Sequence, residues 1–238
     1  MSWEDAERSL AQLARRFALS DAQVQQLRLY AQVLANDSLA PTTLRTPQAI
    51  LDDHLADALV ALELPEFGRA GMIADIGAGA GVPGIPLAVA LPAAKVVLLE
   101  ANGRRCEFMR AVVSRLKLED RVQVIQARAE TWHGGHGICD VTTARAVAPL
   151  DVVAEYGAPL LRLDGIMVVW RGRRDVQAEQ DAARAGGALG LTVAEVVSVA
   201  PYVGASQRHL HLFRKTAPTP SRFPRRDGVA RKRPLGRI

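Results

Sequence analysis

The stretch of sequence that decides the fold runs from Asp75 to Pro86 and reads DIGAGAGVPGIP. It closes a short apolar run at residues 72–76 and leads into a helical stretch. Ligands bind at such strand-to-helix turns in doubly wound α/β sheets, and glycine lets the backbone come close to a small molecule. Gly79-x-Gly81-x-x-Gly84 also matches the dinucleotide-binding pattern, which is weak evidence by itself. The stretch therefore predicts a ligand site on an α/β sheet.

Three residues in and after this stretch favour S-adenosylmethionine over NAD as the ligand. Asp75, two residues before the first glycine, would repel a pyrophosphate but suits a ligand with an ammonium group. Pro83 stands where the helix of a dinucleotide site would begin, so the usual amide site for an anion cannot form. Glu100 ends the next apolar run and can accept hydrogen bonds from both hydroxyls of a ribose. A glycine turn without a ligand is the alternative.

Strands alternate with helices along most of the chain. Short β-branched runs lie at residues 72–76, 95–100, 122–126, 138–143 and 166–170, and helical stretches lie between them at 104–116, 150–161 and 176–189. This alternation predicts a mostly parallel, doubly wound sheet with helices on both faces, which is a Rossmann-like α/β fold. Two further runs, 191–199 and 209–214, are close enough to pair as antiparallel strands.

The chain divides into three predicted parts. Apolar residues spaced three and four apart predict helices through residues 1–65, with an N-cap box at Ser20 and Gln23 and a third helix after Pro47. We expect this helical extension to be followed by a Rossmann-like domain at 66–216 and a basic tail at 217–238. The length of 238 residues and the hydrophobic fraction of 49% suit one large domain with small additions.

The net charge of +5 is unevenly distributed. Residues 207–238 hold ten Lys and Arg but only one acidic residue, Asp227, which leaves the rest of the chain at −4. A basic tail on a mildly acidic body predicts a polyanionic partner. The alternative is a solvated tail that only aids solubility.

Metal and membrane sites are not expected. Cys106 and Cys139 have no second cysteine or histidine at ligand spacing. Charged residues such as Lys95 and Arg104 interrupt every apolar run before it reaches the length of a membrane span. We therefore expect a cytoplasmic protein, and a monomer.

Several motifs occur together with the glycine-rich stretch. They are His54-Leu55-Ala56-Asp57, the EANGRRCEF stretch from Glu100 to Phe108, Arg128-Ala129-Glu130, Thr143-Ala144-Arg145-Ala146, Gln207-Arg208-His209-Leu210, Phe223-Pro224-Arg225-Arg226 and Lys232-Arg233-Pro234-Leu235. Together they resemble the bacterial small-subunit (16S) ribosomal RNA guanine-N7 methyltransferase family, also called glucose-inhibited division protein B. The resemblance runs from about His54 to the C-terminus.

The resemblance implies an enzyme that uses S-adenosylmethionine, with ribosomal RNA or the small ribosomal subunit as its partner. The residues expected to bind the cofactor are Asp75, Gly77, Gly79, Val82, Glu100, Ala129, Glu130 and Arg145. Val82 would pack on the adenine or the methionine stem. Ala129 and Glu130 would hydrogen-bond the adenine, and Arg145 would bind the methionine carboxylate.

Two of these roles have alternatives. Arg145 can instead form a surface ion pair, for example with Asp151. Glu130 can instead be an acidic residue at a helix start.

The expected chemistry needs no general base, because guanine N7 carries a free lone pair at neutral pH. Positioning and electrostatics would then supply catalysis, and we name no catalytic acid or base. His54 and Asp57 are expected to be a buried packing pair, and His133 and His136 exposed loop residues.

Two stretches depart from the family pattern where substrate RNA is expected. They are Ala40-Pro41-Thr42-Thr43 and Trp170-Arg171-Gly172. The competing functions are methylation of another RNA, a protein or a small molecule, an NAD(P) oxidoreductase, and a non-catalytic RNA-binding protein.

Overall fold

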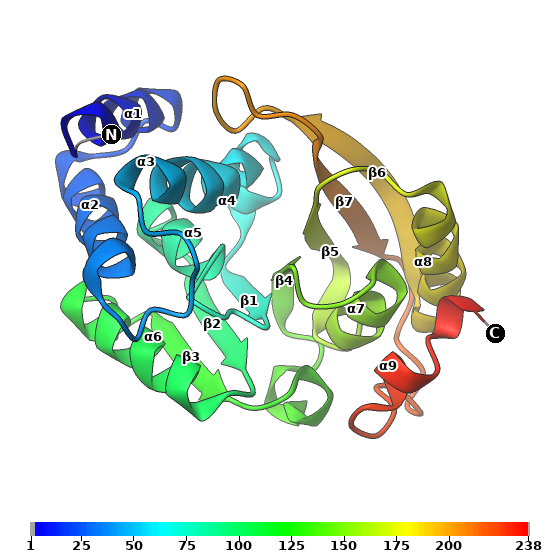
Figure 1. Ribbon diagram of the computed structural model, residues 1–238. Helices are drawn as coiled ribbons and strands as arrows, with labels where there is room; N and C mark the ends of the chain where they lie inside the picture. The colour runs from blue at the N-terminus through cyan, green and yellow to red at the C-terminus, as the bar shows by residue number, and fades with distance from the viewer. Residues whose placement is uncertain (1–2, 238) are drawn as a thin grey trace.

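A computed structural model describes residues 3–237 and contains one seven-stranded sheet in the order β3-β2-β1-β4-β5-β7-β6 (Figure 1). The strands are β1 (Met72–Ile76), β2 (Lys95–Glu100), β3 (Val122–Gln126), β4 (Cys139–Arg145), β5 (Leu161–Arg171), β6 (Leu191–Val199) and β7 (Arg208–Lys215). Strands β1 to β5 are parallel, and β7 runs antiparallel to both β5 and β6. The predicted α/β fold and the antiparallel late pair are confirmed.

Helices cover both faces of this sheet. They are α1 (Trp3–Arg16), α2 (Asp21–Asn36), α3 (Pro47–Ile50), α4 (Asp57–Leu59), α5 (Gly84–Ala90), α6 (Gly103–Arg115), α7 (Leu150–Gly157), α8 (Val176–Leu189) and α9 (Val229–Lys232). A π-helical turn, η1 (Leu51–Ala56), joins α3 to α4, and short 3-10 turns follow at η2 (Val60–Glu63), η3 (Phe67–Arg69), η4 (Ala129–Thr131), η5 (His133–Gly135) and η6 (Leu235–Arg237). Helix α7 ends before the predicted residue 161 because Pro159 cannot continue it.

Two apolar cores hold the layers together. Alternate residues of β1 point to opposite faces, so Ile73 joins the core under α1 to α6 while Ala74 and Ile76 join the core under α7 and α8. Figure 1 shows α1 to α6 on one side of the sheet and α7 to α9 on the other. The two cores fix β1, and with it the glycine-rich turn that follows.

The N-terminal helices brace that turn. Tyr30 on α2 is fully buried and donates its hydroxyl hydrogen to the carbonyl of Ala80, 2.8 Å away. Gln23 reaches the carbonyls of Val89 and Ala90 at the end of α5. Helix α2 therefore packs on the loop rather than standing apart from it.

The basic segment after β7 folds against the body. The guanidinium of Arg225 pairs with the fully buried Glu155 on α7, with Nη2 2.5 Å from Oε2. Ala230 on α9 is fully buried, and Arg237 lies 3.4 Å from Asp151. Two of the tail's arginines thus face acidic groups of the same chain. No helix within residues 3–237 combines the length and apolar character needed to cross a membrane.

Candidate functional site

A narrow cavity of about 190 Å³ lies beside the glycine-rich turn, at the carboxyl ends of β1, β2 and β3. It is lined by Ile76, Gly77, Leu99, Glu100, Ala101, Arg105, Ala127, Arg128, Ala129, Glu130, Ala146, Val147, Tyr156 and Arg231. Four of the eight predicted cofactor residues are among them: Gly77, Glu100, Ala129 and Glu130. The structure therefore brings together the ends of three strands that lie far apart in sequence.

Glu100 is held with its carboxylate oriented along the cavity wall. The backbone amide of Gly79 donates to Oε2 at 3.1 Å, and the amide of Asn102 donates to Oε1 at 2.8 Å. Each oxygen keeps further acceptor capacity, which suits two adjacent hydroxyl groups such as those of a ribose. Gly79 thus acts on the site through Glu100, since it does not itself line the cavity.

Gly77 brings the backbone close to the cavity. Its φ of +66° lies in the left-handed region, and a Cβ added there would stand 2.7 Å from Cγ2 of Val147. A side chain at this position would be strained in its backbone and would displace Val147, which also lines the cavity. The local sequence therefore requires glycine where a ligand would pass.

Asp75 and Val82 lie behind the turn and line neither the cavity nor the neighbouring cleft. Asp75 is fully buried and accepts hydrogen bonds from the Gly84 amide at 2.9 Å and the Thr143 hydroxyl at 2.8 Å. Burial raises the pKa of Asp75 to about 7. Its carboxylate already satisfies the first amide of α5, so this helix start offers no site to a pyrophosphate.

A wide cleft of about 1000 Å³ adjoins the narrow cavity. It is lined by Ala40, Pro41, Thr42, Thr43, Leu44, Asp53, His54, Asp57, Arg105, Arg145, Ala146, Leu150, Trp170, Arg171, Gly172, Arg173, Asp175, Ala178, Arg208 and His211. Arg105 and Ala146 line both spaces. Ala146 has a φ of +57°, which is uncommon for a residue other than glycine, and among the five such residues of the described chain only Ala146 lines the two spaces.

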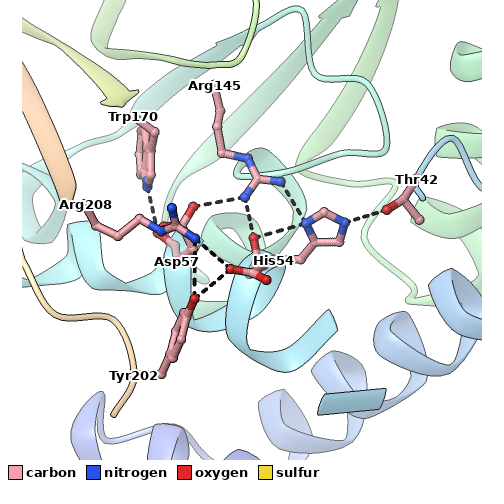
Figure 2. Close-up of polar contacts among 8 residues, drawn as sticks. Thr42, His54, Asp57, Arg145, Trp170, Tyr202 and Arg208 are labelled. Atoms are coloured by element: carbon pink, nitrogen blue, oxygen red, sulfur yellow. Dashed lines mark hydrogen bonds and ion pairs between the residues drawn. The ribbon is translucent and has the colours of Figure 1, made fainter. Parts of the chain in front are cut away.

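Arg145 lines the wide cleft and is fixed against the π-helical turn (Figure 2). Its Nη1 lies 3.0 Å from Oδ2 of Asp57 and 2.6 Å from the carbonyl oxygen of Asp53. Its Nη2 donates to Nδ1 of His54 at 2.8 Å. Arg145 is therefore paired with Asp57 rather than with Asp151, and its role toward a methionine carboxylate stays a prediction.

His54 is uncharged in this network and connects Arg145 to Thr42. Because arginine only donates, Nδ1 of His54 accepts the shorter contact from Arg145 and does not donate to the Asp53 carbonyl 3.2 Å away. Nε2 then carries the proton and donates to the Thr42 hydroxyl 2.8 Å away. Burial, assisted by the charge of Arg145, lowers the pKa of His54 to about 4. Burial also raises the pKa of Asp57, although Arg145 opposes this. Both side chains are buried, as the sequence predicts.

A second branch of the network was not found from sequence. Arg208 on β7 lies 2.8 Å from Oδ1 of Asp53, the same atom that accepts from the Tyr202 hydroxyl at 2.7 Å. The indole of Trp170 donates to the carbonyl of Asp57 at 2.7 Å. Figure 2 shows Trp170 from β5, Arg208 from β7 and Tyr202 from the loop between β6 and β7 converging on the helical turn. Arg208 and Trp170 lie in stretches that the sequence singles out, whereas nothing in the sequence points to Tyr202.

The remaining predicted residues lie away from both spaces or at their rims. His133 and His136 are exposed, as expected, and no three of the His, Cys, Asp and Glu side chains between residues 3 and 237 cluster as a metal site. The two stretches that depart from the family pattern, residues 40–43 and 170–172, both line the wide cleft. Exposed Arg105 and Arg173 add positive charge to its rim.

Comparison with solved structures gives the fold class. The chain is similar to mitomycin 7-O-methyltransferase, with a TM-score of 0.59 and 19% identity over 90% of this chain and 67% of that one. It is also similar to the S-adenosylmethionine-dependent methyltransferase SibL, with a TM-score of 0.58 and 18% identity over 90% of this chain and 74% of that one. The sheet is therefore that of the S-adenosylmethionine-dependent methyltransferase fold.

Comparison with sequences gives the family. The family model described as rRNA small subunit methyltransferase G matches residues 23–211. Ribosomal RNA small subunit methyltransferase G of Chloroflexus aggregans is 38% identical over 226 residues, 91% of this chain and 92% of that protein. The protein of the same name from Rubrobacter xylanophilus is 38% identical over 223 residues, covering 91% and 85%. The chain belongs to the rRNA small subunit methyltransferase G family.

Proposed function

We propose that this protein transfers the methyl group of S-adenosylmethionine to N7 of a guanine in small-subunit ribosomal RNA. The observation that carries the proposal is the junction of the two spaces. The narrow cavity holds Gly77 and the oriented Glu100, and it meets the wide cleft at Arg105 and Ala146. A cofactor seated along the glycine-rich turn would present its reactive end to a substrate in the cleft.

The sizes of the two spaces support this division. About 190 Å³ is less than a small-molecule site usually needs, so a cofactor in the narrow cavity must extend toward the wide cleft. Glu100, Ala129 and Glu130 suit the nucleoside end. Arg145 lies on the cleft side, and three of its five N–H groups bind Asp57, the Asp53 carbonyl and His54, which leaves two for a ligand. We keep it as the candidate for the methionine carboxylate.

The residues of this chain position the reactants and take no proton. S-adenosylmethionine supplies an electrophilic methyl group, and guanine N7 supplies a free lone pair. His54 has both ring nitrogens engaged, and Asp57 is occupied by Arg145, so neither is placed as a general base. Catalysis in this proposal comes from alignment of the two reactants where the narrow cavity meets the wide cleft at Ala146.

Charge around the cleft supports an RNA substrate. Arg105, Arg171 and Arg173 line it, and arginine binds phosphate through paired hydrogen bonds. The proposal also includes a monomeric enzyme that acts in the cytoplasm.

The proposal is tested with radiolabelled S-adenosylmethionine and unmethylated small-subunit RNA, offered both naked and in assembled subunits. We expect label in RNA that is cleaved at a single guanosine by N7-specific chemistry. Label in another base, or label transferred only to small molecules or protein, would overturn it. Size-exclusion chromatography with light scattering on the same sample tests the monomer.

A further inference from the structure

The segment at residues 227–231 forms part of the rim of the narrow cavity. A carboxylate oxygen of Asp227 lies 3.0 Å from Nε of Arg128. The backbone amide of Gly228 donates to Oε1 of Glu130 at 3.4 Å. Both partners, Arg128 and Glu130, line the cavity. The contacts therefore attach the end of the chain to the cofactor side of the molecule.

Arg231 completes the rim and lines the cavity itself. Its Nη2 donates to the carbonyl oxygen of Val147 at 3.0 Å. Burial and the nearby Glu130 raise the pKa of Tyr156, whereas Arg231 opposes that rise. The guanidinium thus lies between the loop after β4 and the side chains of Tyr156 and Glu130.

The position of Arg231 is fixed by anchors on the far side of α7. Arg225 makes hydrogen bonds from its backbone amide and its guanidinium to Glu155. Ala230 is fully buried in the core under α7 and α8, and Figure 1 shows α9 beside α7. The segment is therefore part of the folded wall, and its contacts hold Arg231 at the cavity.

We propose that Arg231 is a cofactor-binding residue that covers the nucleoside end of S-adenosylmethionine. This inference rests on the proposed function. Glu100 on the opposite wall suits the ribose, and Ala129 and Glu130 beside Arg231 suit the base. A planar guanidinium stacks on flat aromatic rings, so the purine is the part of the cofactor that Arg231 fits.

Charge argues for the same end of the cofactor. The methionine end carries a sulfonium, an ammonium and one carboxylate, so its net charge is positive and disfavours a nearby guanidinium. Its one carboxylate already has a candidate partner, Arg145, on the side of the wide cleft. The purine carries no charge. Arg231 lies at the rim near Glu130 and is not among the residues shared with the wide cleft, so the methionine end extends away from it.

The inference is tested by calorimetry, which measures the affinity of the full-length protein for three ligands. They are S-adenosylmethionine, S-adenosylhomocysteine and 5′-methylthioadenosine, which lacks the amino-acid end. We expect R231A to bind all three about tenfold more weakly, the range of a desolvated cation–π contact. The matched control is K232A, which removes the same charge from the next residue, exposed and outside the cavity lining.

The outcomes separate this inference from the proposed function. Wild-type protein that binds none of the ligands contradicts the proposed function itself. If the wild type binds the ligands and R231A binds them with affinities within twofold of the wild type, only the role of Arg231 is contradicted. A loss confined to the two ligands with an amino-acid end would place Arg231 there and overturn the nucleoside assignment. An equal loss in K232A would mean a general charge effect and would overturn it too.

Discussion

At the scale of single residues, one wall of the wide cleft includes a buried acidic side chain, that of Asp57. Asp57 is 7% exposed and takes part in ion pairs with Arg145 at 3.0 Å and with Arg208 at 3.6 Å. Removing one partner of such a pair leaves an uncompensated charge, which costs more than the pair contributes. Arg145 therefore has a structural role beside any role in binding.

Arg145→Ala is expected to lower both stability and cofactor affinity. The free energy of unfolding should fall by about 1–3 kcal/mol, because Arg208 still lies near Asp57 and compensates in part. Urea unfolding measures the first effect and calorimetry the second. Unchanged affinity in a variant that is folded at the assay temperature would remove Arg145 from the cofactor site.

Protonation of His54 should weaken the fold in mild acid. Its pKa is about 4 in the folded protein and 6.5 as a free side chain, so the unfolded chain takes up the proton first. The stability contributed by the neutral ring is present above pH 6.5 and is lost as the pH falls toward 4. Asp75, whose pKa burial raises to about 7, acts with the opposite sign, so only a difference between variants isolates His54.

That difference is measured with His54→Gln, since glutamine can accept from Arg145 and donate to Thr42 without titrating. The wild type should lose more stability than the variant between pH 7 and pH 5. The difference between their unfolding free energies should therefore be smaller at pH 5 than at pH 7. Parallel curves across this range would contradict the assigned protonation state.

At the scale of elements, the turn after β1 contains two glycines that have similar backbone conformations but different surroundings. Gly77 and Gly79 have φ of +66° and +59°, but only at Gly77 would an added Cβ strike a side chain, that of Val147. At Gly79 the nearest atom is the Gly77 carbonyl oxygen at 3.8 Å. Replacing each glycine in turn therefore distinguishes the cost of backbone strain from the effect of a change in cavity shape.

Gly79→Ala should cost about 1 kcal/mol of stability from the left-handed backbone alone, with cofactor affinity changed less than threefold. Gly77→Ala carries the same strain and also moves Val147, so its affinity should fall more than about tenfold. Thermal unfolding and calorimetry on both variants compare the two costs. Equal affinity losses would mean that Val147 does not shape the site.

The same elements show what could be predicted from sequence. The strands Met72–Ile76, Lys95–Glu100 and Val122–Gln126 match the predicted runs to the residue because β-branched stretches are local signals. Gly77 follows β1 and Glu100 ends β2, so both predicted residues line the cavity. Local patterns therefore predicted the sheet and Glu100, whereas the family resemblance was needed for Gly77, Ala129 and Glu130.

The rest of the site depends on contacts between distant segments. Arg208 meets Asp53 across 155 residues, and Gly228 meets Glu130 across 98. No periodicity encodes such pairings, since they arise only when the π-helical turn and the last segment dock on the sheet. A count of charges likewise could not show that Arg225 faces a buried Glu155.

At the scale of the whole molecule, the basic tail has two kinds of arginine. Arg225 neutralises Glu155, whose side chain is 1% exposed. Arg225→Ala should therefore lower the free energy of unfolding by about 3 kcal/mol, the lower end for a broken buried pair. The neighbouring Arg226 is exposed, so Arg226→Ala should change the free energy of unfolding by no more than about 0.5 kcal/mol. Equal unfolding midpoints for the two variants would contradict an anchored tail.

Deleting the tail is consequently a poor test of RNA binding, because truncation at Ser221 would remove Arg225 and Arg231 together. A sharper variant keeps the anchors and replaces three exposed basic residues, Arg226, Lys232 and Arg233, with glutamine. We expect this triple variant to unfold and bind S-adenosylmethionine as the wild type does. RNA affinity should fall at low salt, since the body of the chain carries net negative charge.

The salt dependence decides whether these three charges meet phosphate. Each phosphate neutralised on single-stranded RNA adds about 0.7 to the slope of log affinity against log salt, so three lost contacts should reduce the slope by about 2. Binding of small-subunit RNA is measured by filter retention across a salt series. The control replaces three exposed basic residues that line neither space, Arg15, Arg104 and Arg110, with glutamine. If both variants keep the wild-type slope, the exposed charge of the tail serves solubility, and the RNA must be held by the arginines of the cleft.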